Sequence, residues 1–101
     1  MITAKDRATL RGIAQKYTPV VTIGKGGITD QVIESIGFVI DKRELIKIRL
    51  LPNSGLEAKS ASAEICEKLK ADGIQFIGNI VVIYKRSNKK DAKHILWQSL
   101  L

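Results

Sequence analysis

The sequence predicts an α/β fold, in which a compact layered domain has the order α-β-α-β-α-β-β and a four-stranded mixed sheet. Three segments repeat apolar residues at helical spacing, and four others show the alternation or β-branched composition of strands. The last two strand segments are separated by Gly78-Asn79, a spacer that closes an antiparallel hairpin and therefore makes the sheet mixed. The chain of 101 residues, 45% of them hydrophobic, is long enough for one core and one domain.

The first helix is predicted over residues 3–17. Thr3 is a suitable N-cap, and Pro19 biases Thr18 away from helical backbone. One face of this helix is apolar and the remaining face is largely cationic. The residues expected to face the core are Leu10, Ile13, Ala14 and Tyr17.

A short strand over residues 20–23 leads into a glycine-rich loop, and a second helix then runs to about Lys42. Thr29 is the predicted N-cap, and Asp30 favours the positive end of the helix dipole. Phe38 falls on the polar side of the helix, where it could pack under the C-terminal tail. The residues expected to face the core are Val32, Ile33, Ile36, Val39 and Ile40.

The second half of the chain supplies the remaining strands and one helix. Residues 44–50 form a strand that alternates, so that Lys47 and Arg49 share one face and the apolar residues share the other. The third helix is predicted over residues 57–72 with Gly73 as its C-terminal stop. The other predicted strands are 74–77 and 80–85, and the residues expected to be buried are Ile46, Ile48, Leu50, Ala58, Ala61, Ile65 and Leu69.

The charge balance favours a polyanionic partner. The chain has 17 basic and 10 acidic side chains, a net charge of +7, and most of the surplus lies in residues 1–28 and 85–93. Nucleic acid is the leading partner class, with an anionic membrane surface second. No apolar stretch is long enough to span a bilayer and no leader is visible, so we expect a cytoplasmic protein that is not bound to a membrane.

Enzymatic chemistry is not expected. A single cysteine, Cys66, and a single histidine, His94, cannot form a zinc site, and because His94 lies in the C-terminal tail beyond the last strand, a catalytic triad is not expected. Cys66 borders an apolar stripe and is interpreted as a small buried hydrophobe. We therefore predict no catalytic residue, no metal, no cofactor and no small-molecule substrate.

The loop Gly24-Lys25-Gly26-Gly27 is the one local motif with a mechanism attached. It does not fit the P-loop, and Thr29 stands where the dinucleotide fingerprint needs its last glycine. It does fit Gly-x-x-Gly, the loop by which KH-type modules clamp a nucleic-acid backbone. Its glycines are expected to adopt positive φ and to let a phosphate approach the amides at the start of the second helix. A plain strand-to-helix turn is the alternative.

Four segments resemble, in order and spacing, the signatures of the chloroplast RNA splicing and ribosome maturation (CRM) domain, most closely its stand-alone bacterial YhbY-like form. They are residues 10–14, 19–29, 44–49 and 77–86. The resemblance implies a fold similar to the C-terminal domain of translation initiation factor three and RNA binding through the glycine loop and neighbouring cations. For the bacterial members it also implies association, as an assembly factor, with ribosomal RNA in precursors of the large ribosomal subunit. It implies no catalytic residue.

We therefore predict an RNA-binding domain over residues 1–86 and a basic, then apolar, tail over residues 87–101 that contains Trp97. The runner-up is a small protein-interaction module that uses the tail, although packing of the tail onto the domain is favoured over a partner-binding role. Lys47 and Arg49 could equally be ordinary solvated strand residues. By resemblance or by charge, the predicted RNA contacts are Gly24, Lys25, Gly26, Gly27, Lys5, Arg7, Arg11, Lys47 and Arg49.

Overall fold

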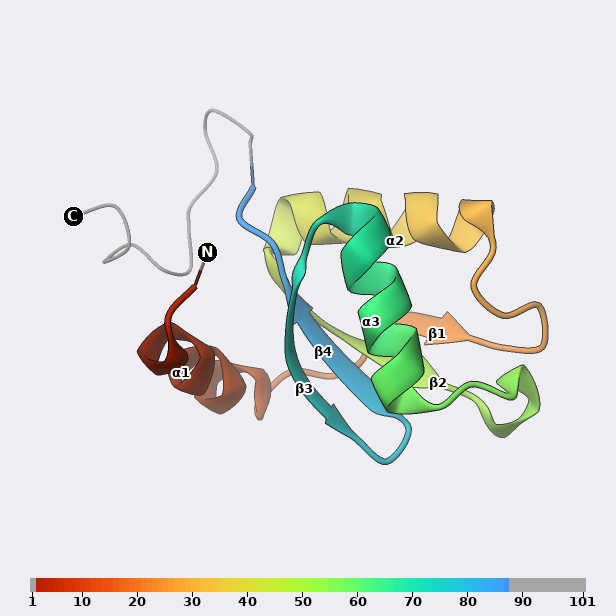
Figure 1. Ribbon diagram of the computed structural model, residues 1–101, viewed down its shortest axis with the longest axis horizontal. Coiled ribbons are helices and arrows are strands. Elements are labelled where there is room, and N and C mark those ends of the chain that lie inside the picture. The colour runs from red at the N-terminus through yellow and green to blue at the C-terminus, as the bar shows by residue number, and fades with distance from the viewer. Residues whose placement is uncertain (1, 88–101) are drawn as a thin grey trace.

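The computed structural model describes residues 2–87, which form one sheet with helices on both of its faces (Figure 1). The elements follow the predicted order α-β-α-β-α-β-β, so the fold class is confirmed. The short 3-10 helix η1 (Pro52–Ser54) lies between β2 and α3. The helices are α1 (Ala4–Ala14), α2 (Asp30–Arg43) and α3 (Ala58–Leu69), and the strands are β1 (Val21–Ile23), β2 (Leu45–Leu50), β3 (Asp72–Ile77) and β4 (Ile80–Tyr84).

The four strands lie in the order β1-β2-β4-β3. β1 runs parallel to β2, whereas β4 pairs antiparallel with both β2 and β3, so the sheet is mixed as predicted. Ile23 at the end of β1 lies opposite Leu50 at the end of β2. The glycine loop that follows β1 therefore starts beside the carboxyl end of β2.

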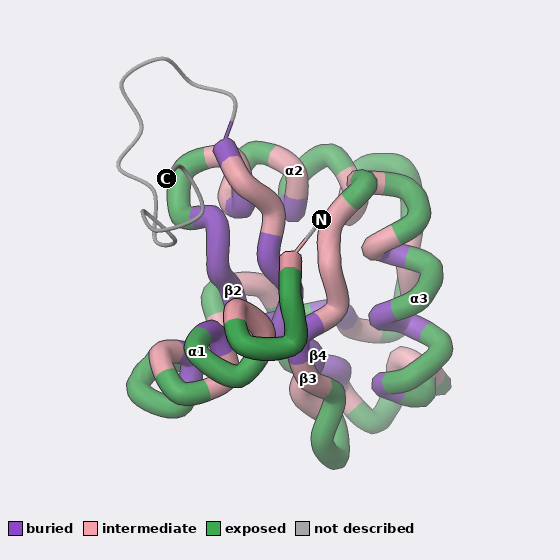
Figure 2. Tube along the Cα trace, turned by 60° about the vertical axis from the view of Figure 1, so that its left-hand side comes forward, coloured by how far each residue is buried: buried purple, intermediate pink, exposed green. Residues whose placement is uncertain are grey.

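Two apolar clusters hold the layers together, and Figure 2 shows mostly buried β2 and β4 between the helices. The larger cluster joins one face of the sheet to α2 and α3, and the smaller joins the other face to α1. Alternation along β2 separates the clusters, because Ile46, Ile48 and Leu50 belong to the larger one and Leu45 to the smaller one. The face of Lys47 and Arg49 is consequently the α1 face.

Helix α1 is shorter than predicted. It begins at the Thr3 cap, whose hydroxyl accepts from the Asp6 amide while the Asp6 carboxylate accepts from the Thr3 amide. It ends at Ala14, and the Tyr17 amide donates a hydrogen bond to the Ala14 carbonyl at 2.9 Å. Tyr17 therefore lies in the connection to β1 with 36% of its surface exposed, and its predicted place in the core is wrong.

Helix α3 also ends earlier than predicted, at Leu69, because Lys70 adopts a left-handed φ of 56° and the next residues enter β3. Gly73 is therefore a strand residue and its predicted role as a helix stop is wrong. A Cβ at Gly73 would lie 3.1 Å from Ser62 Oγ, so the glycine allows α3 to pack closely on β3. Cys66 lies half-buried beside it.

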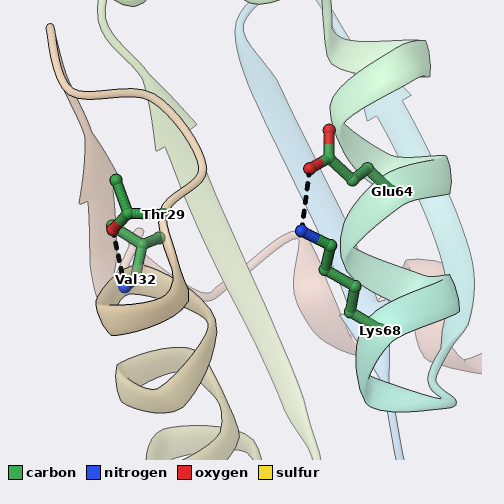
Figure 3. Close-up of polar contacts among 4 residues, drawn as sticks. All are labelled: Thr29, Val32, Glu64 and Lys68. Carbon is green, nitrogen blue, oxygen red and sulfur yellow. Dashed lines mark hydrogen bonds and ion pairs between the residues drawn. The ribbon is translucent and has the colours of Figure 1, made fainter.

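Helix α2 begins as predicted, with the Val32 amide donating to Thr29 Oγ1 at 3.1 Å (Figure 3). Its last residue is Arg43, and Glu44, predicted as the first residue of a strand, is the C-cap with a φ of 64°. The Glu44 side chain is buried, and its carboxylate accepts from the Ser87 amide at 2.6 Å. This bond attaches the segment after β4 to the junction of α2 and β2.

Phe38 lies on the surface of α2 with 66% of its area exposed. The predicted packing of the tail over Phe38 concerns residues 88–101, including Trp97, which lie outside the described residues. On α3, Lys68 pairs with Glu64 at 3.3 Å across one helical turn, which is typical of a solvated helix face (Figure 3).

Candidate nucleic-acid interface

The segment from Gly24 to Gly27 forms a tight turn between β1 and α2. The Gly27 amide donates to the Gly24 carbonyl at 3.0 Å, and Gly27 has a φ of +71°. Gly24 and Gly26 do not have positive φ, so the expectation that all three glycines occupy left-handed backbone is wrong for these two. Backbone strain therefore requires a glycine at Gly27 alone within this turn.

Packing does not require the other two glycines either. A Cβ at Gly26 would meet nothing within 4 Å, and one at Gly24 would make an ordinary contact of 3.5 Å with Leu51 Cδ1. Lys25 is exposed, and within the described part of the chain the amides of Lys25 and Gly26 donate no hydrogen bond. The outer part of the turn thus has open space, one cation and two available donors.

The start of α2 is less open to an anion than the turn. Thr29 already accepts from the Val32 amide, and its carbonyl accepts from Ile33 at 3.0 Å. Asp30 places a carboxylate in the first helical turn, where it interacts favourably with the helix dipole and repels a phosphate. An anion at this site would therefore be held by the amides of the turn and by Lys25.

The predicted cations of α1 lie far from the glycine turn. In Figure 1 the helix is at the left and the turn at the right of the sheet. Lys5 is exposed and Arg11 is half-buried. Arg7 is also half-buried, and its Nη1 donates to the Gly73 carbonyl, which ties α1 to the edge strand β3. The nine predicted residues do not form one compact cluster.

Lys47 and Arg49 lie between these two regions on the α1 face of the sheet. Lys47 is half-buried and Arg49 is exposed. Arg49 lies opposite Thr22 of β1, two residues before Gly24. Together, the predicted residues follow β2 from the end covered by α1 to the end beside the glycine turn.

A pocket of about 400 Å³ lies on the path between α1 and β1. Two of its lining residues are joined by a main-chain hydrogen bond, in which the Val20 amide donates to the Lys47 carbonyl at 3.0 Å. Its basic lining residues come from two stretches of the chain, because Lys16 belongs to residues 16–20 and both Arg43 and Lys47 belong to residues 43–47. Sequence reasoning named Lys47 but missed Lys16 and Arg43 as site residues. The lining residues are Lys16, Tyr17, Thr18, Val20, Arg43, Leu45, Ile46 and Lys47.

Residues 2–87 contain no group of three His, Cys, Asp or Glu side chains that could hold a metal ion. Burial raises the pKa of the Cys66 thiol above its ordinary value, which disfavours the reactive thiolate at neutral pH. None of the helices in residues 2–87 is both long and apolar enough to cross a bilayer.

Comparison with known proteins places the chain among bacterial relatives along nearly its whole length. The model of the CRS1 / YhbY (CRM) domain matches residues 2–85. The Bacillus subtilis protein named "Probable RNA-binding protein YqeI" is 35% identical over 94% of this chain and 97% of its own length. A Haemophilus influenzae protein named "RNA-binding protein" is 30% identical over 87% of this chain and 89% of its own. The solution structure of a Staphylococcus aureus protein superposes with a TM-score of 0.75 at 34% identity, covering 93% of this chain and 99% of that one.

Proposed function

The chain belongs to the CRS1 / YhbY (CRM) domain family, and on that premise we propose that it binds RNA, with the glycine turn as the main backbone contact. RNA binding is supported by the names of the relatives and by the net charge of +7. The proposed target is ribosomal RNA in precursors of the large ribosomal subunit. This finer assignment is supported by the resemblance of the sequence to the stand-alone bacterial members.

The single observation that carries the proposal is the open outer part of the glycine turn. Neither strain nor packing explains the glycines at Gly24 and Gly26, whereas close approach of a ligand to the backbone would. A phosphodiester oxygen needs hydrogen-bond donors and positive charge, which the free amides and Lys25 supply. The turn is therefore a site for the nucleic-acid backbone rather than for a base edge.

The predicted cations act on phosphates in the same way, so the binding should be sensitive to salt. Each phosphate that a Lys or Arg neutralises contributes roughly one unit to the slope of log affinity against log salt concentration. Lys25→Ala is expected to lower this slope by about one unit for unrelated RNA sequences alike.

The decisive variant is Lys25→Asp/Gly26→Asp, which places two carboxylates where the phosphate is proposed to bind. RNA affinity at low salt should fall on the order of 100-fold, because like-charge repulsion adds to the lost attraction. The matched control is Lys59→Asp/Ser60→Asp, which changes the net charge by the same amount at two exposed positions of α3. Affinity is measured by filter binding and folding by circular dichroism with thermal melting.

A folded turn variant that binds RNA as tightly as the parent would show that the segment is a plain turn. Equal losses in the turn variant and the α3 control would reduce the effect to net charge. The ribosomal target is tested by sedimenting cell lysate at low magnesium, where the parent should comigrate with large-subunit precursors and the turn variant should stay at the top of the gradient.

A further inference from the structure

The pocket between α1 and β1 combines three cations with an exposed aromatic ring. Lys16, Arg43 and Lys47 line it, and no Asp or Glu does. Within the described part of the chain, none of these three cations forms an ion pair. The carboxylate of neighbouring Glu44 does not line the pocket: it is buried and accepts from the Ser87 amide. Among the described residues, the positive charge of the pocket lining is therefore not compensated by an ion pair.

Tyr17 is the aromatic member of the lining, and the fold does not use it in the core. It belongs to neither apolar cluster and is 36% exposed, while the adjacent lining residue Val20 is 41% exposed. An accessible aromatic face beside several cations matches a nucleotide, which combines a flat base with a negative phosphate. The pocket volume of about 400 Å³ falls in the range of roughly 300 to 1,000 Å³ that small-ligand sites occupy.

We propose that this pocket binds one nucleotide of a single-stranded RNA segment, with the base stacked on Tyr17 and the phosphate held by Lys16, Arg43 and Lys47. The inference rests on the proposed RNA-binding function and adds a second contact, distinct from the glycine turn. The two sites flank β1, since Val20 lines the pocket before the strand and Gly24 follows it. Arg49 lies between them, opposite Thr22 of β1.

Stacking on Tyr17 has a consequence that backbone binding lacks. A base in an RNA duplex is already stacked and paired, so it is not available to an aromatic side chain, whereas an unpaired base is. The pocket should therefore favour single strands, while the glycine turn contacts phosphates that both forms of RNA present.

The test compares Tyr17→Ala, Tyr17→Phe and Phe38→Ala, the last as a matched control because Phe38 is an exposed aromatic residue on α2. Affinity is measured for a 12-nucleotide unstructured RNA, for a duplex of the same sequence and for free uridine monophosphate. Tyr17→Ala should weaken single-strand binding about tenfold through the lost stacking and leave duplex binding unchanged. Tyr17→Phe and Phe38→Ala should bind both RNAs like the parent, and thermal melting verifies that each variant is folded.

Several results would overturn the inference. Equal losses on single strand and duplex would exclude stacking, and an equal loss in Phe38→Ala would exclude a specific role for Tyr17. Free uridine monophosphate that binds as tightly as the oligonucleotide would make the pocket a mononucleotide site instead. Unchanged binding by Tyr17→Ala, together with loss in the Lys25→Asp/Gly26→Asp variant, would reject the pocket and keep the proposed function. A parent protein that binds no RNA would reject both.

Discussion

The glycine turn and α1 have the same predicted role, yet the fold treats their side chains differently. Arg7 of α1 is half-buried and donates to the Gly73 carbonyl, so its guanidinium helps to hold the helix on β3. Lys25 in the turn is exposed and forms no ion pair within residues 2–87. A cation that hydrogen-bonds within the fold mainly stabilises it, whereas a cation without an intramolecular partner is available to a ligand.

The same contrast holds for glycines. At Gly73 a Cβ would come within 3.1 Å of Ser62 Oγ, so the close packing of α3 explains the residue. At Gly26 a Cβ would meet nothing within 4 Å. A glycine that packing explains is a poor candidate for a binding site, and a glycine that the fold does not explain is a better one.

Charge reversal on the strand between the two regions decides whether they form one binding surface. In Lys47→Glu/Arg49→Glu, RNA affinity at low salt should fall on the order of 100-fold, because both reversed charges would face the bound backbone. A loss no larger than that of the Lys59→Asp/Ser60→Asp control would mean that the strand lies outside the footprint. The turn and α1 would then have to act separately. Filter-binding titrations over a series of salt concentrations provide the measurement.

Removing the Arg7 guanidinium tests whether this side chain stabilises the fold. Arg7→Ala should lower the free energy of unfolding by about 1 to 2 kcal/mol, because a charged donor is lost and the Gly73 carbonyl loses its partner. Lys5→Ala, at an exposed position of the same helix, should change it by less than about 0.5 kcal/mol. Urea denaturation followed by circular dichroism compares them. Equal stability of the two variants would contradict a structural role for Arg7.

The smallest expected effect distinguishes the glycines within the turn. Gly27→Ala should destabilise the fold by about 1 kcal/mol, because alanine is strained at a φ of +71°. Gly26→Ala should leave the melting temperature unchanged, since the added Cβ would meet nothing within 4 Å. It should weaken RNA binding, because the same Cβ would obstruct a phosphate that approaches the backbone. A Gly26→Ala variant that melts earlier than the parent would show that the fold requires this glycine after all.

The sequence alone determined the element types, their order and the faces of the strands and helices. These features depend on interactions between residues at most a few positions apart, such as the Thr3 and Thr29 caps, the alternation along residues 46–50 and the two-residue hairpin at Gly78. The position of the glycine turn followed from the same local signals. Its backbone conformation did not, because sequence composition does not reveal which glycine of a turn adopts positive φ.

The tertiary structure decided where α3 ends and which cations meet. Asp72 and Gly73 leave the helix because they pair with Tyr84 and Ile83 of β4, and this pairing outweighs the local helical pattern. Arg7 reaches Gly73 across 66 positions of sequence. The pocket joins Lys16 to Arg43 and Lys47 only because the pairing of β1 with β2 brings residues 16–20 beside residues 43–47. Contacts of this kind depend on chain reversals and strand register, which no local sequence pattern encodes.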